Sequence, residues 1–153
     1  MSGSAGVRFA HISIVASDWR KLASFYEDVF HSIPVLPTRD LAGEWLDEAT
    51  GLRGAHIRGV HLRLPGQGES GPTLEIFQYD RMTDRSDKGP NVSGLAHLAF
   101  GVDDVDLTVR AVLASGGSVV GRRTDVQVPD AGSLTFQYVA DPEGNLIEVQ
   151  RWG

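Results

Sequence analysis

Residues 9–14 read Phe-Ala-His-Ile-Ser-Ile, and residues 95–100 read Leu-Ala-His-Leu-Ala-Phe. In both stretches an apolar residue and an alanine precede a histidine, and apolar and small residues alternate after it. More than half of the 153 residues separate His11 from His97. A repeat of this kind indicates that the chain is built from two similar halves.

Each of these two stretches is followed by a predicted helix. Ser17-Asp18 and Asp103-Asp104 supply side-chain oxygens of the type that accepts the free amide hydrogens of a first helical turn. Apolar residues then recur at helical spacing, namely Trp19, Leu22, Tyr26, Val29 and Phe30 in the first half and Val105, Val109, Val112 and Leu113 in the second. The first helix is expected to end before Pro34 and the second at Gly116-Gly117.

The two halves also end alike. Residues 73–77 read Thr-Leu-Glu-Ile-Phe and residues 146–150 read Leu-Ile-Glu-Val-Gln, so each half closes with an apolar strand that carries one glutamate. Further strands are predicted over 55–64, 118–121 and 134–140, with a bulge at Gly59. Residues 141–145, Asp-Pro-Glu-Gly-Asn, predict a tight turn.

These elements predict an α+β fold of two paired βαβββ modules, whose mixed sheets form a cup around a central site. The first module is expected over residues 7–79 and the second over 94–152, and the polar residues 80–93 are expected to be a linker. Because a half of about 60–70 residues is marginally stable alone, we expect residues 1–153 to form a single domain.

Composition excludes several classes of protein. With 14 basic against 20 acidic residues the net charge is −6, which disfavours a nucleic-acid binder. The chain has no cysteine, so thiol nucleophiles and cysteine metal sites are excluded. No signal peptide or membrane-spanning stretch is recognisable, and we expect a soluble, cytoplasmic protein.

Four ligand-type residues are predicted to share the open faces of the sheets. Because side chains alternate along a strand, His11 and Glu75 in the first half and His97 and Glu148 in the second point away from the apolar faces. Imidazole nitrogen and carboxylate oxygen suit a divalent ion such as Zn, Ni, Co, Mn or Fe(II). Such a set leaves coordination positions open for water or substrate.

A lone histidine on a strand is more often a packing or surface residue than a ligand, and a lone glutamate is usually solvated. The repeat favours the metal site, because an unpaired glutamate in an apolar strand is costly and yet occurs in both halves. His56 and His61 are interpreted as solvated residues or neighbours of the ligands. Trp45, with Leu41 and Leu46, lies on a candidate lid.

Three segments resemble the vicinal oxygen chelate superfamily, which includes glyoxalase I, methylmalonyl-CoA epimerase, extradiol dioxygenases and antibiotic-resistance proteins. The first is Ala-His-Ile at 10–12 with Ser-Phe-Tyr-Glu-Asp-Val-Phe at 24–30, and the second spans residues 94–105. The third is Asp-Pro-Glu-Gly-Asn-Leu-Ile-Glu at 141–148. The resemblance extends from about Phe9 to Trp152 and is specific for the superfamily but weak for substrate.

The resemblance implies that one divalent metal is held by His11, Glu75, His97 and Glu148, a set most similar to that of bacterial glyoxalase I and then of methylmalonyl-CoA epimerase. It implies a lactoylglutathione lyase-like or acyl-CoA epimerase-like enzyme that removes a proton next to a carbonyl, with the metal stabilising an enediolate or enolate. Glu148 or Glu75 would be the base.

An epimerase-like reaction would use a further carboxylate, for which Glu44, Asp47 and Glu48 are candidates. A small-molecule substrate and a homodimer are expected. The sequence does not identify the substrate or the metal, and it leaves open whether the site lies within one chain or is shared by two. The alternative functions are a non-catalytic protein that binds an antibiotic and, less favoured, an Fe(II) dioxygenase of extradiol type.

Overall fold

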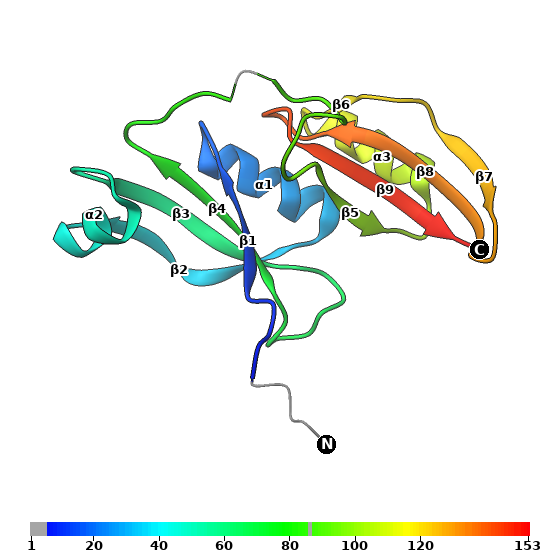
Figure 1. Cartoon of the computed structure of the whole chain (residues 1–153). Coiled ribbons are helices and arrows are strands. Elements are labelled where there is room, and N and C mark those ends of the chain that lie inside the picture. The colour runs from blue at the N-terminus through cyan, green and yellow to red at the C-terminus, as the bar shows by residue number, and fades with distance from the viewer. Residues whose placement is uncertain (1–5, 86) are drawn as a thin grey trace. The chain divides into compact units, whose positions relative to one another are not determined.

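The computed structural model describes residues 6–85 and 87–153. Along these residues nine strands and three helices follow one another in the order shown in Figure 1: β1 (His11–Val15), α1 (Trp19–Phe30), β2 (Ile33–Ala42), α2 (Glu44–Thr50), β3 (His56–Arg63), β4 (Thr73–Tyr79), β5 (His97–Gly101), α3 (Val105–Ala114), β6 (Ser118–Val119), β7 (Thr124–Val128), β8 (Gly132–Ala140) and β9 (Leu146–Trp152). Among the described residues, no helix has the length and apolar character that crossing a membrane requires.

The chain forms two compact units. The first contains the residues up to Ala23 together with His31–Met82, and the second contains Ser24–Phe30 together with Thr83–Gly153. Strands β1 to β4 therefore belong to the first unit and strands β5 to β9 to the second. The contacts of α1 are divided, since its first turn belongs to one unit and the remainder to the other.

The sheet of the first unit has the strand order β1-β4-β3-β2. Strand β1 pairs with β4 in parallel, and β3 pairs with both β4 and β2 in antiparallel fashion. Burial alternates along β4, where Leu74 and Ile76 are fully buried and Glu75 between them is partly exposed. The apolar face and the polar face of this strand are therefore those expected from the sequence.

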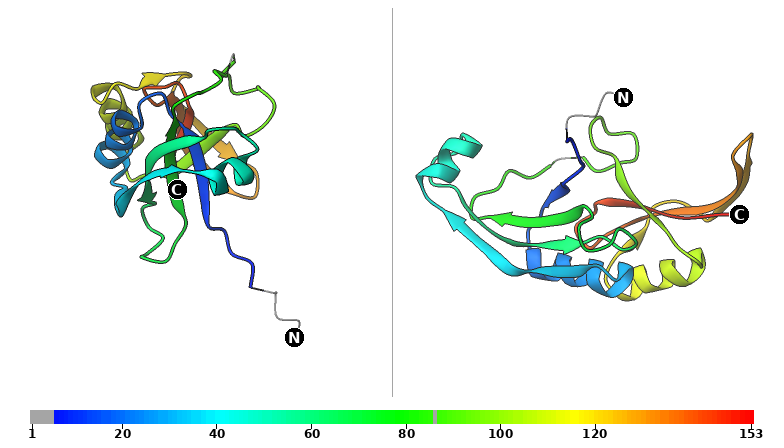
Figure 2. Two further views of the ribbon diagram at one scale, coloured as in Figure 1. Left: turned by 90° about the vertical axis from the view of Figure 1, so that its left-hand side faces the viewer. Right: turned by 90° about the horizontal axis from the view of Figure 1, so that it is seen from below.

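The sheet of the second unit repeats the plan with the order β5-β9-β8-β6. Strand β7 pairs with the beginning of β8, on the edge that β6 pairs with near its end and away from β9. Strand β5 pairs with β9 in parallel, as β1 does with β4. Helix α3 packs against β8 and β9 and covers one face of this sheet (Figure 2). The predicted α+β class and its two βαβββ modules are confirmed, with α2 and β7 as additional elements.

Both helix starts follow the sequence prediction. The Asp104 carboxylate accepts a hydrogen bond from the amide of Leu107 at 2.8 Å, and the Asp18 carboxylate accepts one from Lys21 at 3.1 Å. Each bond satisfies an amide hydrogen that has no partner within its helix. Helix α1 ends at Phe30, and His31 follows it with a left-handed φ of 56°.

The predicted bulge at Gly59 is wrong in position. Gly59 pairs in regular register with Phe77 of β4. The break in register lies on β2, the other neighbour of β3, between Val35 and Arg39. Gly59 is required for a different reason, because a Cβ atom there would lie 2.0 Å from the carbonyl oxygen of Ile76 and 2.4 Å from the Phe77 ring.

Replacement of Gly59 by alanine should therefore destabilise the protein by about 1–3 kcal/mol, since backbone atoms cannot yield as a flexible side chain would. Urea denaturation followed by circular dichroism measures this change. The matched control is Gly101→Ala, because Gly101 also lies on a strand but has open space around its missing Cβ. Equal free energies of unfolding for the two variants would contradict this account of Gly59.

An exposed ion cluster joins β2 and β3 to the residue that follows β4. The imidazole of His56 contacts Asp40 at 2.5 Å through Nε2 and Asp80 at 2.9 Å through Nδ1, and Arg58 pairs with both carboxylates. The pKa of Asp40 is lowered, mainly by its hydrogen bond with His56. The pKa of Asp80 is also lowered, mainly by the hydrogen bond that it accepts from Arg58.

A lowered carboxyl pKa in the folded state stabilises the fold above the ordinary pKa of aspartate, near 4, and this stabilisation is lost as the pH falls through the lowered value. We therefore expect Asp80→Asn to lower the melting temperature at pH 7 and to lower it less near pH 2.5. Thermal unfolding at the two pH values measures the difference. Asp84→Asn removes the same charge outside the cluster and serves as control, and an equal loss at both pH values would refute the assignment.

Candidate metal centre

Three ligand-type side chains meet on the polar face of the first sheet. Glu75 of β4 is opposite Ser13 of β1 on one side and opposite His61 of β3 on the other. His11 is two residues before Ser13 on β1, so its side chain lies on the same face of the sheet as that of Ser13. The Oε2 atom of Glu75 lies 3.1 Å from Nε2 of His61 and 3.6 Å from Nε2 of His11. One nitrogen from each histidine and one oxygen from Glu75 all lie within 4.8 Å of one another.

These separations fit a divalent cation. Bonds of about 2.1 Å from a metal to imidazole nitrogen and carboxylate oxygen place neighbouring ligand atoms about 3.0–3.4 Å apart. The separation between His61 and Glu75, 3.1 Å, falls in this range, and that between His11 and Glu75, 3.6 Å, is slightly longer. The Glu75 side chain is only 14% exposed, whereas that of His11 is 45% exposed, so the group is open on the His11 side.

The ring of His61 is held from several directions. Its Nδ1 lies 2.9 Å from the Thr73 hydroxyl, and the rings of His11 and Phe77 meet it edge-on at 5.5 and 5.7 Å. Burial is the main cause that lowers the pKa of His61, the charge of Glu75 raises it, and the charges of Arg39 and His11 lower it. The imidazole is therefore neutral at pH 7, which is the state that binds a metal.

The second unit contains the matching pair. Ala99 of β5 is opposite Glu148 of β9, so His97 occupies the position that His11 has in the first unit. Its Nε2 lies 3.2 Å from Oε2 of Glu148, whose side chain is 15% exposed. Tyr138 of β8 is directly opposite Glu148, and its ring meets that of His97 edge-on at 5.2 Å.

The two modules thus place a histidine and a glutamate at equivalent register positions, as the sequence repeat predicts. They differ at the residue opposite the glutamate, which is His61 in the first module and Tyr138 in the second. From the sequence pattern, His61 is expected to be a solvated residue or a neighbour of the ligands. The signal missing from that pattern is the register of β3 with β4, which places His61 directly beside Glu75.

Helix α2 covers the end of this face of the first sheet. Leu46 packs with Ile57 and Phe77, and Leu41 and Tyr79 lie against the same cluster. Phe77 is two residues from Glu75 on β4, so α2 and the candidate ligands share one face. The Trp45 side of the helix is turned outward, since that residue is 56% exposed.

Among the three candidates for a second base, Asp47 has a structural role. Its carboxylate accepts hydrogen bonds of 2.7 Å from the amides of both Gly54 and Ala55, and it thereby closes the loop between α2 and β3. Glu44 and Glu48 stay candidates, the first of them at the first position of the helix. The remaining strand histidine, His56, belongs to the ion cluster with Asp40 and Asp80.

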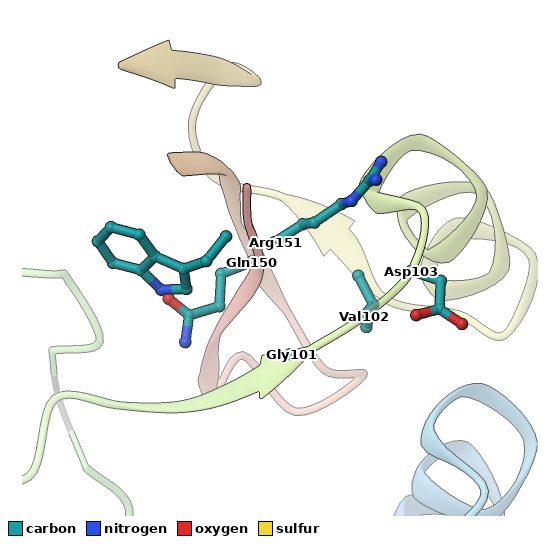
Figure 3. Close-up of a pocket in the computed structure, with 6 residues that line it drawn as sticks. Gly101, Val102, Asp103, Gln150 and Arg151 are labelled. Atoms are coloured by element: carbon teal, nitrogen blue, oxygen red, sulfur yellow. The ribbon is translucent and has the colours of Figure 1, made fainter. Parts of the chain in front are cut away.

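A shallow hollow opens at the ends of β5 and β9 in the second unit (Figure 3). Its lining includes Gly101, Asp103, Gln150 and Arg151. Gln150 lies two residues beyond Glu148 on the same face of β9 and pairs with Gly101. None of the four predicted metal ligands lines the hollow.

Known proteins share this sequence pattern and fold. A family model described as the Glyoxalase/Bleomycin resistance protein/Dioxygenase superfamily matches residues 8–149. A lactoylglutathione lyase of Haemophilus influenzae is 37% identical over 81 residues, which are 53% of this chain and 55% of that enzyme, so the match spans little more than half of either protein.

Two further comparisons cover nearly the whole chain. The uncharacterised protein YaeR of Escherichia coli K12 is 26% identical over 140 residues, 91% of this chain and 92% of that protein. The crystal structure of a glyoxalase family protein from Bacillus cereus superimposes with a TM-score of 0.82 at 22% identity, covering 99% of this chain and 98% of the other. At this identity the similarity of structure shows the fold alone.

Proposed function

Because the chain belongs to the glyoxalase/bleomycin resistance protein/dioxygenase superfamily, we propose that it is a metal-dependent lyase or isomerase that removes a proton from a carbon next to a carbonyl group. One observation carries this proposal: each module places a histidine against a half-buried glutamate at the same register position. The partial match to a lactoylglutathione lyase supports the same class of reaction.

In this proposal His11 and Glu75 of the first module and His97 and Glu148 of the second hold a divalent ion. The donor types fit Zn, Ni, Co, Mn or Fe(II), and the histidine and glutamate atoms of each pair are already 3.6 and 3.2 Å apart. When bound, the ion supplies positive charge that stabilises negative charge developing on substrate oxygens.

The two glutamates are the candidate bases. Each lies beside the histidine of its module, and their side chains are only 14% and 15% exposed. In this role Glu148 or Glu75 would accept the proton from the carbon and return it to the neighbouring carbon or to the other face of the same carbon. The first outcome is a glyoxalase-type reaction and the second an epimerisation.

The substrates to test are the hemithioacetal of a 2-oxoaldehyde with a thiol and acyl-CoA esters with an acidic α-hydrogen. Incorporation of solvent deuterium, followed by NMR, reports proton removal for both. We expect exchange with the metal-loaded protein, its loss after chelation with EDTA, and its return on adding one of the five divalent ions.

Exchange that survives complete removal of the metal would contradict metal dependence. If neither substrate class exchanges with any of the five ions, the proposed reaction is wrong. Tight binding of a bulky ligand by the metal-free protein would instead support a non-catalytic binding function.

The expected homodimer is part of the proposal, and its support is membership of the superfamily. Sedimentation equilibrium is expected to give twice the 16.5 kDa mass of one chain. A monomer at all concentrations would overturn this part of the proposal without affecting the assigned reaction.

A further inference from the structure

The first module carries an imidazole that has no counterpart in the second. His61 and Tyr138 occupy equivalent positions, each directly opposite the glutamate of its module on the neighbouring antiparallel strand. Both side chains lie on the face that also bears the histidine of the first strand, and the ring of each meets that histidine edge-on. Only His61 offers a nitrogen ligand there.

The contacts of the His61 ring leave its Nε2 atom facing Glu75, where a metal ion held by that glutamate would lie. With Nδ1 bonded to the Thr73 hydroxyl, Nε2 faces Oε2 of Glu75 at 3.1 Å, closer than His11 approaches the same oxygen. When Nδ1–H donates to Thr73, the lone pair of Nε2 faces a carboxylate oxygen. A cation between these two atoms, either a proton or a metal ion, removes the repulsion between them.

Resting on the proposed function, we propose that His61 is a third metal ligand of the first module, beside His11 and Glu75. A hydrogen bond that fixes the other ring nitrogen commonly orients a metal-binding histidine, and here the Thr73 hydroxyl occupies that place. Thr73 is thus a positioning residue, which holds the ring in the tautomer that leaves Nε2 free.

This third ligand gives the two modules unequal roles. The first module supplies two imidazoles and one carboxylate, and the second supplies one of each. Glu75 could then leave the ion to accept a proton while His11 and His61 keep the metal on the first module. Glu148 shares its module with only one imidazole, that of His97. If Glu148 left the ion, the second module would retain a single ligand, whereas the first would retain two if Glu75 left.

The test counts imidazole ligands directly. The protein is loaded with Co²⁺, and X-ray absorption spectroscopy gives the number of coordinated imidazoles in the wild type, His61→Gln and His56→Gln. His56 is the matched control, since it lies on the same strand but belongs to the ion cluster of Asp40 and Asp80. Thermal unfolding of each variant without metal establishes that it is folded.

We expect the His61→Gln spectrum to lose one imidazole relative to the wild type and the His56→Gln spectrum to lose none. Metal affinity measured by competition with a chelator should fall by at least about 10–100-fold in His61→Gln, and by a smaller factor in Thr73→Val. An unchanged imidazole count in a folded His61→Gln protein overturns the inference.

The outcome is separable from the fate of the proposed function. If the wild type binds Co²⁺ with imidazoles that are lost in His11→Ala and His97→Ala but not in His61→Gln, the proposed four-ligand set stands and the role of His61 is wrong. If the wild type binds no divalent ion, the proposed function fails and the inference fails with it.

Discussion

Replacing Glu148 with glutamine should slow metal-dependent deuterium exchange by about 10²–10⁴-fold, the usual contribution of a positioned base. Glutamine keeps the size of the side chain but lacks a basic oxygen, and its amide is a weaker metal ligand than a carboxylate. Because the Glu148 side chain is partly exposed and projects from the polar face of β9, the substitution should leave the fold intact. Exchange rates at saturating metal measure the loss.

The control for this experiment is Glu69→Gln, which removes the same charge from an exposed loop between β3 and β4. Its exchange rate should equal that of the wild type. A Glu148→Gln protein that is folded, binds metal and retains more than about one tenth of the exchange rate would show that Glu148 is not the base. The same measurement on Glu75→Gln would then decide whether that glutamate accepts the proton.

Asp141→Ala should destabilise the protein by about 3–5 kcal/mol, the largest stability effect expected for this chain. The Asp141 carboxylate, only 2% exposed, accepts hydrogen bonds from the Tyr26 hydroxyl, from the amides of Glu143 and Asn145, and from the Asn145 side chain, at 2.8–3.0 Å. Alanine removes the acceptor of all four bonds, and a buried donor such as the Tyr26 hydroxyl that loses its acceptor costs about 1–3 kcal/mol. Urea denaturation measures the change.

Tyr26→Phe removes only one of these hydrogen bonds and should cost about 1.5–3 kcal/mol, as expected for a bond to a charged group. Burial, and secondly the charge of Asp141, raises the pKa of Tyr26 well above its ordinary value, so its hydroxyl stays protonated and donates. An Asp141→Ala protein within about 1 kcal/mol of the wild type would show that these hydrogen bonds of Asp141 do not stabilise the second unit.

The repeat in the sequence predicts the elements that have strong local signals. Asp18 and Asp104 are unambiguous helix starts, and both cap their helices in the structure. The turn at Asp141 was recognisable because Gly144 supplies the left-handed φ, here 83°, that it needs. In each of these cases the physical cause lies within a few residues of chain.

The missed elements lack such signals. Strand β2 contains Pro34 and Pro37, and proline argues against a strand because it cannot donate a ladder hydrogen bond. Helix α2 has only seven residues, and its stability comes from packing Leu46 onto Ile57 and Phe77, which are distant in sequence. Tertiary contacts of this kind override weak local preferences.

In the candidate site, too, some positions follow from local sequence signals and others depend on tertiary contacts. The pairs His11–Glu75 and His97–Glu148 could be predicted because alternation along a strand fixes the face of each residue. The position of His61 depends on the register between β3 and β4, which a long intervening loop, residues 64–72, leaves undetermined in the sequence. Likewise, only the structure shows that Asp47 closes a loop.

The central claim is that His11, Glu75, His97 and Glu148 hold one divalent ion. It is tested most directly by the metal content, from plasma mass spectrometry, of purified wild-type protein and the His11→Ala and His97→Ala variants after dialysis against equal concentrations of the same ion. The account predicts one ion per chain in the wild type and loss of most of that metal in each variant, because removing one ligand weakens binding at both modules. Full occupancy in His97→Ala would contradict it.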